Sequence, residues 1–585
     1  MKKIVALFLL LVMVFPSVSL AESVDPENQY TVWLRVGADK SFFPDYSQNP
    51  GVLYLKTLPL GPEGKHVDFS FFVPVSGSET DNFNTLIGTE EYMDLMDLSA
   101  FTGTAIELYE DEVALDITEY VEQYMPNYMA FLDAHPDLKA TSTNLIDGEP
   151  RMIQIRKYED DVNFMWGGYI YRRDWILKYG TNPVDGSAFS GEFTDPDDVY
   201  SWVDNIVFPS GEVYPKFISD WEWMFEIFTR AMEDLGIKDG YCTTLYYPGY
   251  LETGDIMTGF GGGNPLWYLD DDRNIQFGAT SDNFRAYLQC MNTWYKKGWL
   301  DKSFNERTSD MFYEINMAGI YSGKVGMWYG YPSTLGGNLN NPDDPYLAGF
   351  VGAAAPQPIN DVYGSNAQKG HEPDAMYQIN QEGVAYIVTP SILDKDIPTF
   401  FAALDYFYSE EGALMMGFGL NKEQFEATQS ELYIRYGITD GAYQLIPNEE
   451  GVLCAANYPQ VKDGEINGAI RPERMPGLNA VSRRDYSLED QYLLEHRTYW
   501  TMYKNTGWLP ESFTGQMDVD DATDAAKVQT RVKEFMTKNV PTFIKGSRDP
   551  YSDSDWDAYV NALNKYKPEK VTDIYQDLAD RLYGE

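Results

Sequence analysis

Residues 284–332 constrain the fold most, because a helical pattern there leads directly into a short apolar run. Apolar side chains recur at the i, i+3, i+4, i+7 spacing from Phe284 onward, and Gly298 can close the helix. Residues 324–328 then predict a buried strand that ends in a Trp-Tyr-Gly-Tyr turn. Ligands of open α/β sheets bind beyond the carboxyl ends of strands. The turn is therefore either ordinary core or a stacking surface for a sugar ring.

The same alternation of strand and helix patterns runs through most of the chain. Strand patterns occupy residues 30–36, 67–75 and 383–389. Helical patterns occupy residues 120–132 with a bend at Pro126, 221–235, 398–417 and several segments between 528 and 582. Alternating patterns predict α/β lobes with helices covering sheets, and the last helices are expected to pack on one lobe.

The N-terminus predicts export. Lys2 and Lys3 precede an unbroken apolar run, and small residues at Ser19 and Ala21 suit a signal peptidase. We expect residues 1–21 to be a cleaved signal peptide and the mature chain to be soluble, periplasmic or extracellular. No cysteine lies near the cleavage site, so we expect no lipid anchor on a cysteine of its own.

The formal net charge is −46, which argues against binding to nucleic acid or to anionic membranes. Aromatic residues are 15% of the chain, too many for a disordered acidic protein. The length of 585 residues favours two lobes or more.

Cysteine and histidine usage gives no metal signature. Cys242, Cys290 and Cys454 are far apart in sequence, and the four histidines form no His-x-x-x-His pair. We expect buried, reduced cysteines; whether any two are linked stays open at this point. The glycine-rich segment 259–268 lacks the Gly-Lys-Ser/Thr ending of a phosphate loop. The sequence therefore predicts no metal and no cofactor.

Several segments resemble the extracellular solute-binding proteins of family 1, the sugar-binding receptors of ABC importers. The similarity is greatest to the large lipoprotein-like forms of Firmicutes-type bacteria. The matching segments, in family order, are residues 115–127 with Asp147-Gly148, 169–175, 284–304, 404–412, and 543–546 with 556–559. Each segment is weak alone, and their order makes the set specific.

The resemblance implies a two-lobed periplasmic-binding-protein fold of class α/β, with a cleft between the lobes that closes on a ligand. We expect residues 28–160 and 325–400 in the first lobe, and 165–320 and 405–585 in the second. Hinges are expected near residues 156–164, 322–326 and 387–407. The resemblance also implies ABC permease subunits as partners of a monomeric chain.

This sequence departs from the family in two places. The cysteine of the family's lipid-attachment motif is absent, so tethering to a membrane is in doubt. Many relatives carry a calcium loop after the helix that corresponds to residues 221–235. Residues 234–241 offer too few oxygen ligands for that loop, so we expect no calcium there.

Candidate ligand-binding residues combine aromatic stacking faces with planar polar groups, as sugar recognition requires. Aromatic candidates lie next to loops or strand ends, and polar candidates follow the strand at residues 67–75 or lie in a loop-rich segment. They are Trp328, Tyr329, Trp166, Trp223, Trp267, Glu79, Asp81, Asn82, Arg471 and Arg474. For each aromatic the alternative is core packing, and for each acid it is a solvated surface charge.

We expect a substrate-binding protein that captures a carbohydrate, an oligosaccharide more than a monosaccharide, and that is not an enzyme. Two alternatives stay open. One is an exported glycan-active enzyme, although acids are too abundant for any pair to stand out and no Gly-x-Ser-x-Gly elbow occurs. The other is a free-standing glycan-binding protein without a transporter.

Overall fold

The computed structural model describes most of the chain after the expected signal peptide. The described ranges are residues 24–37, 41–146, 149–161, 167–189, 206–246, 256–261, 265–270, 272–307, 310–311, 315–365, 367, 382–448, 451–458, 461, 466–484, 491–500, 502–503, 509 and 511–583, with only the backbone at 491–494, 497, 511 and 512.

The first lobe is built on a six-stranded mixed sheet in the order β15-β6-β12-β3-β1-β2. Its strands are β1 (Gln29–Trp33), β2 (Asp68–Phe72), β3 (Leu95–Asp97), β6 (Ile155–Glu159), β12 (Glu382–Val388) and β15 (Leu478–Asn479). Strands β1, β2, β3, β6 and β15 run in one direction, and β12 runs against its neighbours. The strand patterns at residues 30–36, 67–75 and 383–389 correspond to β1, β2 and β12.

Helices cover both faces of this sheet, which explains its apolar composition. One face carries the larger core around Val32, Phe69 and Phe400, and the other carries a smaller core around Trp33, Met96 and Ile387. The helices are α1 (Pro50–Leu55), α2 (Glu79–Thr89), α3 (Ala105–Glu110), α4 (Thr118–Tyr124), α5 (Pro126–Ala134), α6 (Pro136–Ser142), α12 (Ile397–Tyr406), α13 (Glu410–Phe418), α14 (Lys422–Thr428), α15 (Glu431–Arg435) and α17 (Ile466–Ala469).

Two β-hairpins complete the first lobe. They are β4 (Asn144–Ile146) with β5 (Glu149–Arg151), and β13 (Tyr443–Pro447) with β14 (Leu453–Asn457). The expected bend at Pro126 is a full break between α4 and α5. The expected helix over residues 398–417 is likewise two helices, because the chain turns at Phe407 before Ser409 caps α13.

The second lobe contains a three-stranded antiparallel sheet in the order β10-β7-β11. Its strands are β7 (Gly168–Arg172), β10 (Met327–Gly330) and β11 (Gly352–Ala355), and a separate hairpin pairs β8 (Trp267–Leu269) with β9 (Ile275–Phe277). Its helices are α7 (Arg173–Tyr179), α8 (Ile218–Leu235), α10 (Asp282–Lys297), α11 (Met317–Tyr321), α18 (Gln491–Trp500), α19 (Glu511–Thr514), α20 (Val519–Ile544), α21 (Asp553–Leu563) and α22 (Pro568–Tyr583).

Helix α10 confirms the expectation for residues 284–298. The Ser281 hydroxyl accepts a hydrogen bond from the Phe284 N–H at 3.1 Å and caps the helix. Gly298 ends it at φ 80°, where a side chain would be strained. The apolar face of α10 packs against α20, and Asn292 donates to the Phe543 carbonyl at 2.8 Å.

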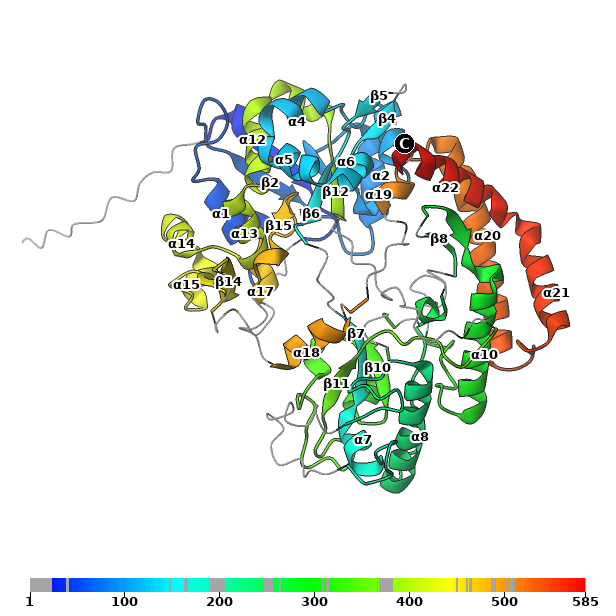
Figure 1. Ribbon diagram of the computed structural model, residues 1–585. Helices are drawn as coiled ribbons and strands as arrows, with labels where there is room; N and C mark the ends of the chain where they lie inside the picture. The colour runs from blue at the N-terminus through cyan, green and yellow to red at the C-terminus, as the bar shows by residue number, and fades with distance from the viewer. Residues whose placement is uncertain are drawn as a thin grey trace, which may run out of the picture.

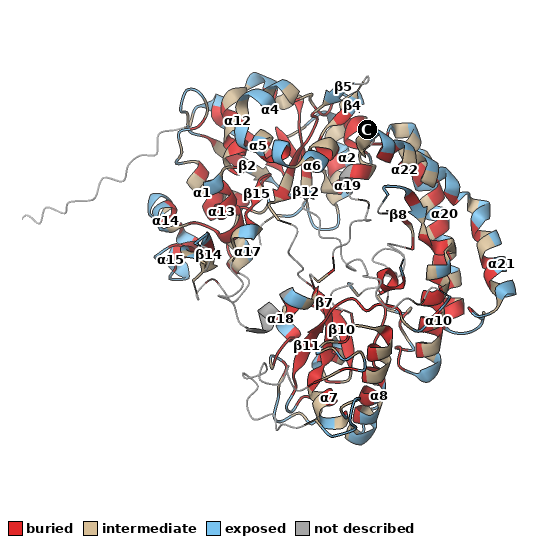
Figure 2. Ribbon diagram, viewed as in Figure 1, coloured by how far each residue is buried: buried red, intermediate tan, exposed pale blue. Residues whose placement is uncertain are grey.

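The C-terminal helices pack on the second lobe, as expected. Phe513, Val532 and Tyr575 belong to the same continuous core as Trp221 and Trp294 of that lobe. In Figure 1 the layer α20–α22 runs along one side of the molecule from the first lobe to the second. In Figure 2 buried residues are drawn along α20 and along the neighbouring α10.

The chain passes from one lobe to the other between β6 and β7, between Tyr363 and β12, and between Arg484 and α18. The first crossing overlaps the expected hinge at 156–164. The other two expected hinges are wrong. Residues 322–326 connect α11 to β10 inside the second lobe, and residues 387–407 lie in the core of the first lobe.

The division between lobes changes accordingly. Strands β10 and β11 pair with β7, so residues 327–355 belong to the second lobe rather than the first. Side chains from Leu404 to Ala480 lie in the core of the first lobe rather than the second. Sequence patterns reveal strands but not which strands pair with each other. For this reason the sequence placed both segments in the wrong lobe.

Cys242, Cys290 and Cys454 are buried and free of disulfides, which confirms that expectation. Over the residues with described structure, every helix is too short or too polar to cross a bilayer. In the same residues, His, Cys, Asp and Glu side chains form no group of three that could hold a metal ion.

Candidate functional site

The strand ends on one side of the first sheet face the second lobe. Strands β1, β2, β3, β6 and β15 all finish on this side, and β12 begins there. Each of the three crossings therefore leaves or enters the first lobe on the same side. In open α/β sheets, ligands bind on this side, beyond the carboxyl ends of the strands.

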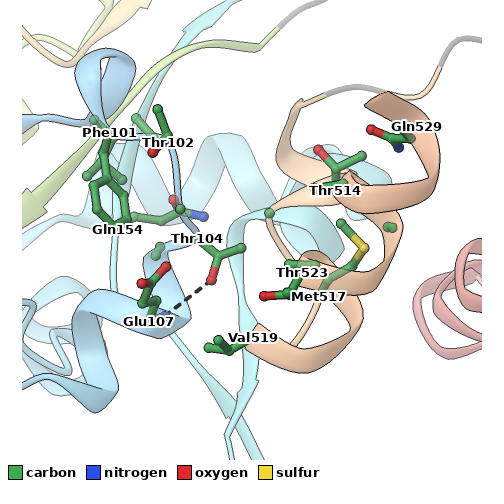
Figure 3. A pocket seen from close by; sticks show the side chains of 18 of the residues that line it. Phe101, Thr102, Thr104, Glu107, Gln154, Thr514, Met517, Val519, Thr523 and Gln529 are labelled. Carbon is green, nitrogen blue, oxygen red and sulfur yellow. Dashed lines mark hydrogen bonds between the residues drawn. The ribbon is translucent and has the colours of Figure 1, made fainter. Parts of the chain in front are cut away.

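A pocket of about 530 Å³ lies where this region meets the C-terminal helices. We call it the inter-lobe pocket (Figure 3). The first lobe supplies the segment after β3, Gln154 just before β6 and Arg156 of β6. The second lobe supplies α19, the first half of α20 and Tyr575 of α22. The polar lining residues are Thr102, Thr104, Glu107, Gln154, Arg156, Thr514, Thr523, Gln529 and Tyr575.

Local hydrogen bonds hold the segment after β3 in place. The Asp97 carboxylate accepts the Ser99 N–H at 2.8 Å. The Thr104 hydroxyl accepts the Glu107 N–H at 3.2 Å and caps α3, as Figure 3 shows. A Cβ added at Gly103 would lie 2.0 Å from Glu107 Oε2. Glycine is therefore the residue that lets the Glu107 carboxylate lie against this turn.

Two polar side chains of the first sheet line the pocket without hydrogen bonds to any described residue. Gln154 is 2% exposed and Arg156 is 4% exposed. The Arg156 Nε–H is buried without a partner among the described atoms. Polar groups buried this deeply normally have partners, so both side chains are available to a molecule in the pocket.

A second pocket, of about 200 Å³, lies within the first lobe and brings together Arg471 and Arg474. Phe42, Phe43 and Tyr46 supply its aromatic side. Burial lowers the pKa of Arg471, and its ion pair with Glu473 at 2.5 Å opposes that shift. Because Arg471 already has a carboxylate partner, it is less available to a ligand than Arg156.

The expected aromatic tip at Trp328 and Tyr329 is core. Trp328 is 2% exposed, stacks on Phe350 and donates from Nε1 to the Thr334 hydroxyl at 3.1 Å. Tyr329 is 5% exposed and donates to the Gly167 carbonyl at 3.1 Å. Strand β10 is the edge of a three-stranded sheet covered on both faces, so its aromatic side chains have no open stacking face.

The other described tryptophan candidates also pack inside the second lobe. Trp267 is buried against Phe277 and donates to the Thr572 hydroxyl at 3.2 Å. Trp223 is half-buried and has edge contacts with Phe189 and Phe208. Neither lines the inter-lobe pocket or the second pocket. Trp166 lies outside the described residues, and its role stays a prediction.

Glu79, Asp81 and Asn82 lie in the first turn of α2, after the carboxyl end of β2. The Glu79 carboxylate accepts the Gly77 N–H at 2.9 Å, and this hydrogen bond holds the pKa of Glu79 below its usual value. Asn82 accepts the indole N–H of Trp33 at 2.9 Å. Asp81 is exposed. These side chains support local structure and line neither pocket, so their binding role stays a prediction.

The residues that line the inter-lobe pocket were not among the candidates predicted from the sequence. Ile153-Gln154-Ile155-Arg156 alternates apolar and polar residues, which predicts a strand with one polar face. That alternation was the available signal for Gln154 and Arg156. The residues from α19 and α20 carried no such signal, because only the packing of those helices brings them to β6.

No family model and no curated protein matches this chain. Solved structures do match its fold over nearly its whole length. An extracellular solute-binding protein from Bifidobacterium longum subsp. infantis aligns with a TM-score of 0.61 at 13% identity, covering 96% of this chain and 100% of its own. The Streptococcus pneumoniae ABC-transporter substrate-binding protein FusA, in complex with kestose, aligns at 0.58 and 14%, covering 94% and 98%.

The alginate-binding protein AlgQ2 aligns with a TM-score of 0.55 at 14% identity, covering 94% of this chain and 98% of its own. These similarities establish the class of fold. The chain has the two-lobed architecture of solute-binding proteins, with additional helices after the second lobe.

Proposed function

We propose that this chain is an exported substrate-binding protein that holds an oligosaccharide between its lobes and delivers it to an ABC permease. The observation that carries the proposal is the inter-lobe pocket, whose polar lining comes mainly from hydroxyl and amide side chains of both lobes. Such groups match sugar hydroxyls as donors and acceptors. The kestose and alginate ligands named for the neighbours of the same fold agree with this class of ligand.

The chemistry of the pocket favours binding over glycan cleavage. Glycosidases generally use two carboxyl groups that flank the scissile bond. Glu107 is the sole carboxylate among the described residues that line the pocket. One carboxylate among hydroxyls and amides suits recognition better than hydrolysis.

A thermal-shift screen over a panel of oligosaccharides tests the proposal. A ligand that binds only the folded state raises Tm by mass action, and calorimetry on each hit then gives Kd. Mass spectrometry of the recovered sugar separates binding from cleavage. If amino acids, peptides or metal ions raise Tm and no glycan does, the carbohydrate proposal fails.

Gln154→Leu gives a sharper test at the level of the site. The substitution keeps the size of the side chain and removes an amide that has no protein partner, so the apo protein should keep its Tm. Affinity for the glycan should fall about tenfold, the usual magnitude of one lost buried hydrogen bond. Gln444→Leu, at an exposed position of β13, is the matched control and should leave Kd unchanged.

Delivery to a transporter is a separate part of the proposal. Genes for a permease beside the gene for this chain would support import. A free-standing glycan-binding protein would have no such neighbours, and its deletion would leave uptake of the bound sugar unchanged.

A further inference from the structure

We propose that the ligand carries a carboxylate and that Arg156 binds it in the inter-lobe pocket. The inference rests on the proposed function and narrows it to acidic oligosaccharides, those that contain a uronate or a sialate.

The first argument is the state of Arg156 itself. Its side chain is 4% exposed, its Nε–H has no partner, and no described carboxylate lies within ion-pair distance. The buried Nε–H of a guanidinium without a partner has lost a hydrogen bond to water and gained none in exchange. An anionic group in the pocket would restore both the charge balance and the hydrogen bonds.

The second argument is how the chain treats its other buried arginines. Arg172 is 1% exposed and forms two hydrogen bonds to the Asp174 carboxylate, at 2.9 and 2.7 Å. Arg173 is 2% exposed and pairs with Glu495. Among the described residues, these two and Arg156 are the fully buried arginines. Arg156 alone of the three lines a pocket, and it alone has no carboxylate partner within the described structure.

The third argument is the geometry of the groups around Arg156. A guanidinium presents parallel N–H donors that match the two oxygens of a carboxylate. The neighbouring Gln154 and Thr104 side chains offer groups suited to sugar hydroxyls. A pocket of about 530 Å³ has room for sugar units beyond the charged group. A carboxylate attached to a sugar therefore fits this lining better than a bare inorganic anion.

Glu107 opposes the effect of Arg156 on the affinity for an acidic ligand. It is the one acidic residue among the described residues that line the pocket, and its carboxylate lies against Gly103. A ligand carboxylate would be attracted by Arg156 and repelled by Glu107. Substitutions at the two positions should therefore change the affinity for an acidic sugar in opposite directions.

The experiment compares matched acidic and neutral probes by calorimetry. The probes are trigalacturonate and its methyl ester, trimannuronate and its methyl ester, and 3′-sialyllactose and lactose. At least one acidic probe should bind more tightly than its neutral partner. Arg156→Gln should weaken that acidic probe about tenfold to a hundredfold and leave the neutral one nearly unchanged. Glu107→Gln should tighten the acidic probe.

The Tm of the apo protein separates a binding role from a structural one. Because Arg156 has no partner to lose, Arg156→Gln should keep or raise the Tm. Arg172→Gln is the matched control, a buried and paired arginine outside the pocket, and should lower the Tm. A fall in Tm for Arg156→Gln as large as that of the control, with unchanged affinity for acidic probes, overturns the inference.

The outcomes distinguish this inference from the proposed function. If neutral glycans bind as tightly as acidic ones, or Arg156→Gln weakens both equally, the inference is wrong and the carbohydrate proposal stands. If no glycan binds but acetate or phosphate raises Tm in an Arg156-dependent way, the carbohydrate proposal fails and the anion site stands. If no probe of any kind binds, both are wrong.

Discussion

Trp328 lies in the core of the second lobe, and its contribution to the free energy of unfolding can be measured. The buried indole stacks on Phe350 and donates to Thr334. Trp328→Ala should lower the free energy of unfolding by about 3–5 kcal/mol, the usual cost of deleting a large buried side chain. Glycan affinity of the folded variant should change less than twofold. Urea unfolding and calorimetry check the two values; normal stability with lost affinity would contradict the core assignment.

At the residue scale, the sequence predicted aromatic and planar polar candidates for the site, yet Trp328, Tyr329 and Trp267 are buried in the core. The reason is that a tryptophan near a strand end fits a core and a cleft equally well, and only tertiary contacts decide between them. Arg471 and Arg474, both candidates from the sequence, line the second pocket, and their binding role stays a prediction. Arg156 was not a candidate, because the alternation of residues 153–156 predicts a polar strand face but not what that face contacts.

Asp396 caps the start of helix α12, and its hydrogen bonds predict a pH dependence of the stability of the protein. Burial raises the pKa of Asp396, but hydrogen bonds from Lys65 at 2.8 Å and from Thr399 outweigh burial, so the pKa lies below its ordinary value. A depressed folded pKa gives stability that is fully present above the unfolded value of about 3.9 and is lost as pH falls through the folded value.

Asp396→Asn should therefore destabilise the protein at about pH 7 and have a much smaller effect at a pH below the folded pKa of Asp396, where the wild-type carboxyl is also protonated. Urea unfolding at both pH values measures the difference. The exposed Asp272→Asn is the control and should show little effect at either pH. A destabilisation that stays equal at the two pH values would show that the Lys65 pair is not its source.

At the element scale, helices and long strands were predictable, and very short strands were not. Helix α10 was expected almost to its last residue, because its apolar spacing and its cap at Gly298 agree. Strand β3 has three residues, Leu95–Asp97, too few to show a period. Missing β3 also hid the segment that follows it, which forms one wall of the inter-lobe pocket.

For the whole molecule, the formal net charge of −46 bears directly on how an acidic ligand would arrive. The field of such a protein repels anions at long range, while Arg156 acts only within the pocket. Added salt screens the long-range repulsion, since the Debye length is about 10 Å at 0.1 M. The association rate of an acidic probe should therefore rise several-fold between about 10 and 200 mM salt.

Stopped-flow tryptophan fluorescence can measure this rate. The neutral partner of the same probe is the control, and its association rate should be nearly independent of salt. An association rate for the acidic probe that falls with salt would instead indicate attraction by the protein as a whole, contrary to this prediction.

Helix α20 links the pocket to the far side of the second lobe. Its first turns line the pocket, and its last turn accepts hydrogen bonds from Asn292 of α10. With 26 residues and a rise of about 1.5 Å each, the helix is about 39 Å long. One continuous helix therefore joins the pocket to the exposed turn at Lys545 and Gly546, which lies too far away to touch a ligand in the pocket.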